Sequence, residues 1–208
     1  MICVFMMILM GSAGVFCQTR DNIIWASVKA QKKINDKITL ILAPIVRIND
    51  DITGYQNSSV DYALKYKLNK NWSTQVLGRT WFIPDGQDRQ FLWLDIAWSR
   101  TLNPFKLSSS LRWHHAFDIK DRMDPDFFRW KTGLTFTGLD RIQFLFNIEP
   151  WFQLNKADQW QRIRYEPGLK LKINDPLDLL LMYRRENTIN TVPSNNLNMY
   201  VLTLTIKV

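Results

Sequence analysis

The chain ends on the stretch LNMYVLTLTIKV, residues 197–208, in which apolar and polar side chains alternate. One parity carries Tyr200, Leu202, Leu204, Ile206 and Val208. The other parity carries Val201, Thr203, Thr205 and Lys207. Because successive side chains of a strand point to opposite faces, the stretch predicts a β-strand with one apolar face.

The same alternation recurs along the chain in segments of about a dozen residues, separated by turn-forming residues. VDYALKYKL (60–68) and RIRYEPGLKL (162–171) are two such segments. Short turns, such as the one at Asn35, alternate with longer polar loops, such as the one near 118–126. The pattern predicts an all-β, up-and-down antiparallel barrel, with tight turns at one end and loops at the other.

The number of strands is harder to predict. Eleven segments are recognisable, but KITLILAPIVRI (37–48) is apolar on both faces and contains Pro44. Bacterial single-chain membrane barrels have even strand numbers. The expectation is therefore a barrel of about 10–12 strands, with ten or twelve preferred.

Amphipathic strands of this kind build two classes of barrel. In a soluble, lipocalin-like periplasmic carrier the apolar face lines the interior, whereas in a membrane barrel it contacts lipid. Strand lengths that suit a tilted membrane crossing, and the asymmetry between turns and loops, favour a transmembrane β-barrel. Aromatic residues near segment ends, as in an interfacial girdle, favour it too. They are Trp72, Trp98, Trp130 and Phe152.

The first residues, MICVFMMILMGSAGVFC (1–17), form the only long apolar run. Their length and small residues suit a secretory signal peptide better than a membrane-spanning helix. The predicted organisation is a signal peptide over 1–17 and an outer-membrane barrel over 18–208. Both cysteines, Cys3 and Cys17, lie in the leader, so the mature chain would contain no disulfide and no cysteine metal site.

The formal net charge is +8, but basic residues share strand parity with acidic ones. Together with the leader, this mixed pattern argues against a nucleic-acid partner. In a barrel the polar parity would converge on one lumen. The predicted lumen-lining network is Arg79, Asp95, Arg112, Arg129, Glu149, Arg162, Arg164, Glu166, Arg184 and Glu186. It is either a charged pore or anion-binding interior, or a set of ion pairs filling a narrow barrel, and the second interpretation is favoured.

A lipid-modifying hydrolase of the outer membrane is an alternative, because some barrels use Ser and His. The two histidines are His114 and His115; Ser110 shares a face with His114 but lies about 13 Å along the strand. Ser99 has the right parity for a cross-strand partner. Adjacent histidines face opposite sides and do not chelate one metal together. No catalytic residue, metal or cofactor is predicted.

The stretches LKYKLNKNW, FLWLDIAWSR, LRWHHAF and IEPWF, with RIRYEPGLKLKINDPLDLLLMYRREN, resemble the outer-membrane barrels catalogued as domain of unknown function 2490, common in Bacteroidetes. The resemblance implies a location in the cell outer membrane, with lipid and the barrel-assembly machinery as partners, and no established activity. The expected role is structural, binding or narrow, porin-like transport with a largely filled lumen and an unknown small-molecule ligand.

We predict that the mature protein begins near Gln18 and co-fractionates with outer membranes, because the apolar leader precedes strands that are only amphipathic. Mass spectrometry of the N-terminus and detergent fractionation of membranes measure both properties. Recovery of the protein as a freely soluble periplasmic species would contradict the membrane barrel and favour the carrier.

Overall fold

The computed structural model describes residues 20–49, 55–84, 86, 88–117, 126–154, 159–190 and 196–208. The predicted signal peptide lies outside these residues. Within them the chain is all-β. None of the described segments forms a helix long and apolar enough to cross a membrane.

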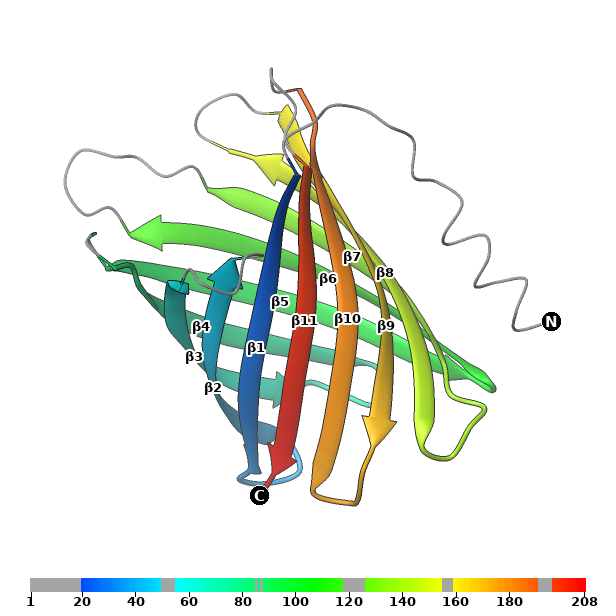
Figure 1. Cartoon of the computed structure of the whole chain (residues 1–208). Coiled ribbons are helices and arrows are strands. Elements are labelled where there is room, and N and C mark those ends of the chain that lie inside the picture. Colours follow the sequence, from blue (N-terminus) through cyan, green and yellow to red (C-terminus); the bar gives the residue numbers. More distant parts are fainter. Residues whose placement is uncertain are drawn as a thin grey trace.

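Eleven strands close into one barrel in which each strand pairs with its neighbours in the sequence (Figure 1). Their bounds are β1 Arg20–Lys33, β2 Ile38–Asn49, β3 Tyr55–Lys67, β4 Trp72–Phe82, β5 Arg89–Leu102, β6 Phe105–Phe117, β7 Phe127–Phe136, β8 Ile142–Gln153, β9 Gln159–Lys172, β10 Leu177–Thr188 and β11 Asn196–Lys207. The predicted all-β barrel is confirmed. The preference for ten or twelve strands is wrong, because all eleven recognised segments form strands.

The odd strand number determines how the barrel closes. Successive strands alternate in direction, so the first and last of eleven run the same way, and β1 pairs with β11 in parallel from Arg20↔Asn196 to Gln31↔Lys207. The Oγ of Ser27 lies 2.7 Å from the Oγ1 of Thr203 across this seam. The barrel is therefore antiparallel except at one contact, and the C-terminal strand is the closing strand as predicted. The first residue of β1 lies at the loop end, whereas the C-terminus lies at the turn end (Figure 1).

Pro44, which weakened the strand prediction for 37–48, lies inside the continuous strand β2. A proline lacks the N–H that a ladder needs, so strands tolerate it only where one side of the ladder is interrupted. The register between β1 and β2 has such an interruption between Ser27↔Ile45 and Ala30↔Leu42, whereas β2 pairs without a gap with β3 through Pro44↔Val60. One missing donor is thus accommodated without ending the strand.

The two faces of each strand meet different surroundings. On β11, Tyr200 and Leu202 are 53% and 42% exposed, whereas Met199 and Val201, which alternate with them, are 3% and 8% exposed. The same alternation on the other strands leaves leucine, isoleucine, valine and aromatic side chains on the outside and buries charged ones inside. This is the reverse of a lipocalin, whose apolar face lines its cavity.

Exposed aromatic side chains on the outer face lie at both ends of the strands. Tyr55, Phe82 and Phe117 are the strand-terminal residues at the loop end, and Trp72 and Phe105 are their counterparts at the turn end. Between the two sets the outer face is mainly aliphatic. An apolar band bordered by aromatic girdles is the surface that barrels present to a lipid bilayer.

We predict that Leu202→Arg lowers the free energy of unfolding in lipid vesicles by ~2–4 kcal/mol, because it places a charge on the outward face near the middle of β11. Thr205→Arg is the matched control: Thr205 lies on the opposite, lumen-facing side of the same strand, so the new guanidinium does not meet lipid. Denaturant titration of both variants measures the difference. Equal losses would contradict the assignment of the outer face to lipid.

Candidate functional site

The inside of the barrel holds two separate arginine–aspartate pairs between neighbouring strands. Arg79 on β4 donates two hydrogen bonds to Asp61 on β3, at 2.5 and 2.8 Å. Arg112 on β6 donates two to Asp95 on β5, both at 2.6 Å. Each guanidinium fits its carboxylate in the bidentate geometry that gives the strongest charge-assisted hydrogen bonds.

A longer chain of ion pairs crosses β7 to β10. The Nη2 of Arg129 lies 2.8 Å from Glu149 Oε1, and the Nη1 of Arg164 lies 3.4 Å from Glu149 Oε2. Arg164 also donates to Glu186, and Arg162 donates to the same carboxylate at 3.0 Å. The acidic groups are each shared by two arginines, so the chain is continuous across four strands.

Glu166 on β9 has no exposed surface, and it binds cations from two different strands. Arg184 on β10 donates to its Oε1 at 2.6 Å, and Lys131 on β7 donates to its Oε2. Because β8 lies between β7 and β9, the Lys131 contact reaches past a whole strand through the lumen. Asn147 on β8 adds a third donor at 3.4 Å.

Tryptophan rings fill the space between the guanidinium groups. The Trp151 ring lies between Arg129, at 3.9 Å from its centroid, and Arg164, at 4.0 Å. Trp93 is covered by Arg79 at 4.5 Å and Arg112 at 4.7 Å. Such stacking is attractive in itself and leaves the guanidinium edges free to bind carboxylates. Both rings are buried, so this part of the lumen is packed with side chains.

All ten residues of the predicted network face the lumen, and each takes part in at least one ion pair. A functional role for these ten residues stays a prediction. Sequence reasoning left Lys131 out of the network, and it placed tryptophans only on the outer face. Trp93 and Trp151 share strand parity with Asp95 and Glu149, which is the signal that identifies them as inward-facing.

Arg47 was also missed, because its strand looked apolar on both faces. Its guanidinium stacks on Trp25 at 4.1 Å and Trp81 at 4.6 Å. Its Nε has no hydrogen-bond partner, and no carboxylate of the described chain lies within ion-pair distance of it. Aromatic faces therefore replace a counter-ion at this position.

The histidines do not form the arrangement that a serine hydrolase needs. His114 faces the lumen among Phe91, Trp93 and Trp151, and neither of its ring nitrogens has a hydrogen-bond partner. His114 pairs with Trp93, and Ser99 lies six residues further along β5, about 20 Å away. The cross-strand contact with Ser99 that the hydrolase alternative would need is thus not made.

His115 faces outward at the loop end, where its Nδ1 lies 2.7 Å from Asp126 Oδ1. This is an imidazole–carboxylate pair, but no hydrogen bond between a histidine and a hydroxyl group occurs in the described part of the chain. The same residues contain no group of three or more potential metal ligands.

A profile of one protein family, described as Protein of unknown function (DUF2490), matches residues 22–198. The chain belongs to this family. The match begins in β1 and ends in β11, so it includes every residue of the predicted lumen network. No curated protein and no solved structure gives a significant match to the chain.

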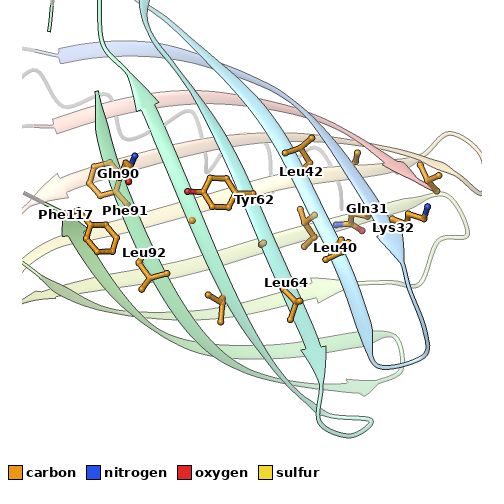
Figure 2. A pocket seen from close by; sticks show the side chains of 16 residues that line it. Gln31, Lys32, Leu40, Leu42, Tyr62, Leu64, Gln90, Phe91, Leu92 and Phe117 are labelled. Carbon is orange, nitrogen blue, oxygen red and sulfur yellow. The ribbon is translucent and has the colours of Figure 1, made fainter. Parts of the chain in front are cut away.

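An apolar groove of about 710 Å³ crosses the outer face of this DUF2490 protein over β1 to β6 (Figure 2). Tyr62 lies in it, and its ring covers Gly78 on the neighbouring strand: a Cβ at Gly78 would come within 2.1 Å of the ring. Leu40, Leu42, Leu64 and Leu92 line the groove around the ring. It is continuous with the apolar outer face, and glycine lets the tyrosine lie flat against the strand.

The tight turns carry ion pairs of a different kind from those of the lumen. Lys33 lies 2.8 Å from Asp36, and Lys172 lies 2.7 Å from Asp175. The hydrogen bond from each lysine lowers the pKa of the aspartate below its usual value. Both aspartates are exposed to water, which screens such pairs.

We predict that Glu166→Leu destabilises the folded barrel by ~3–5 kcal/mol, because Lys131 and Arg184 keep their charges inside without a counter-ion. Asp36→Ala removes an exposed pair and is the control, with a much smaller effect. Urea titration in detergent micelles measures both. A Glu166→Leu variant as stable as Asp36→Ala would show that the buried network contributes little.

Proposed function

We propose that this DUF2490 protein is a small outer-membrane β-barrel with a filled midsection, acting as a structural or binding protein and not as an open channel. The observation that carries the proposal is the distribution of side chains: paired charges are buried inside the closed barrel and large apolar side chains are exposed outside. In water this arrangement would expose the apolar face, whereas in a bilayer that face is solvated by lipid.

Closure supports a membrane location for a second reason. A bilayer offers no hydrogen-bond partner to free backbone groups, so a β-structure that spans it has no open edge. The pairing of β1 with β11 removes both edges of this sheet. The aromatic residues at the two ends of the strands, such as Tyr55 and Trp72, would then lie at the two interfaces.

The orientation follows from the turns and loops. Outer-membrane barrels keep short turns in the periplasm and longer loops outside. In that orientation the C-terminal strand ends in the periplasm, where the assembly machinery would engage it during insertion. The start of β1 at Arg20 would lie at the cell surface, since β1 begins at the loop end and β11 ends at the turn end.

The packed interior argues for a barrier to solutes. Trp93 on β5 contacts guanidinium groups from β4, β6 and β7, and Trp151 on β8 contacts those from β7 and β9. Passage of a hydrated ion would need these stacks to separate and their ion pairs to open. Narrow transport would therefore be a gated event, with the closed form as the resting state.

We predict that the wild type reconstituted in planar lipid bilayers gives no stepwise conductance, because stacked rings and ion pairs fill its midsection. The double variant Trp93→Ala/Trp151→Ala removes the rings and should produce ohmic steps. Trp72→Ala/Trp98→Ala removes two rings of the outer face and is the matched control, expected to stay closed. Steps of similar size for wild type and double variant would overturn the filled midsection.

A further inference from the structure

The net charge of the chain is concentrated at one end of the barrel. The last five residues of each strand at the turn end, together with the turns, contain thirteen lysine or arginine residues and four aspartates. The rest of the chain contains the other fourteen basic and fifteen acidic residues. The charge of +8 therefore comes from the turn end.

Several lysines of this end face the lumen, and three of them have no counter-ion. Lys170 and Lys207 share Asp178, at 3.0 and 2.8 Å. Lys29 on β1, Lys65 on β3 and Lys106 on β6 have the parity of the inward residues of their strands. In the described part of the chain no carboxylate lies within ion-pair distance of these three.

The three unpaired lysines lie among the five residues of their strands nearest the turn end, and β1 and β3 are separated only by β2. The charges of Lys65 and Lys170 both act on Lys29, and the charge of Lys106 acts on Lys65. Asp61, the carboxylate that acts most on Lys29, is already bound on both oxygens by Arg79. Mutual repulsion among like charges makes this region attractive to an anion.

The wall of the lumen at this end includes small side chains on β1, β5 and β6. Ser27, Ala97, Ser99, Ser108 and Ser110 face inward and are all partly exposed, whereas inward residues of the midsection such as Trp93 and Glu149 are buried. Since these serines point away from the outer face, solvent reaches them from within the barrel. The lumen is thus accessible from the turn end up to the packed midsection.

We propose that the turn-end mouth of the lumen is a binding site for a small phosphate-bearing anion, held by Lys29, Lys65 and Lys106. Three ammonium groups supply several donors to the ligand oxygens, and the neighbouring serine hydroxyls supply further donors. The packed midsection forms the floor of the site, so the ligand enters and leaves at the same end. This inference deepens the proposed function by naming a ligand class, and it rests on the closed midsection.

The test uses the full mature chain refolded in an uncharged detergent, with inorganic pyrophosphate as the probe in isothermal titration calorimetry. We expect saturable binding by the wild type. The affinity of Lys29→Met/Lys65→Met for pyrophosphate should be weaker than that of the wild type by a factor of about ten or more. Lys37→Met/Lys70→Met removes the same charge from exposed turn positions and should bind like the wild type. Heat-modifiable gel mobility shows which variants are folded.

Absence of saturation by the folded wild type, or equal losses in the two double variants, would overturn the site. A second measurement needs no variant: pyrophosphate should protect Lys29 and Lys65, but not Lys37 and Lys70, from an amine-reactive label read by peptide mass spectrometry. Uniform labelling of all four would also overturn it. A wild type that conducts yet binds pyrophosphate would contradict the filled midsection and leave the site standing.

Discussion

The parallel contact between β1 and β11 is the constraint on which the rest of this structure depends. It converts an eleven-stranded sheet into a barrel without a free edge, and so separates one interior from one exterior. Only after closure do charged side chains on distant strands face one another. The seam is held by the strand ladder and by polar contacts such as Ser27–Thr203. Parallel pairing is slightly weaker per residue than antiparallel pairing, so the stability of the seam depends on how many residues pair along it.

Once the interior is closed, its charges must satisfy one another. Removing an ion from water costs several kcal/mol, and a carboxylate such as Glu166 offsets that cost through two cations and an amide. Aromatic rings complete the packing, because a guanidinium binds carboxylates in its plane and stacks on rings above and below it. Arg47 shows the limiting case, in which two tryptophan faces take the place of a carboxylate.

The interior is divided along its length by residue size. Large rings and bidentate pairs occupy the midsection, while several serine, alanine and lysine side chains face inward at the turn end. A barrel of ~8–12 strands is narrow enough for side chains to fill, and wide enough to hold a small ligand where the side chains are small. The same fold therefore supports a closed midsection and an accessible cationic mouth.

Local alternation of side chains determined most of the architecture. The strands, their outward faces and the ten inward charged residues follow from period-two patterns. Successive side chains of a strand point to opposite faces whichever strands lie beside it. The parallel contact between β1 and β11 could be recognised only in the tertiary structure, because an odd or even number of strands is a property of the whole sheet. The partners of each charge also depended on the tertiary structure: Lys131 on β7 reaches Glu166 on β9 past β8. Sequence assigns each side chain to a face, and only the curvature of the closed sheet decides which of them meet.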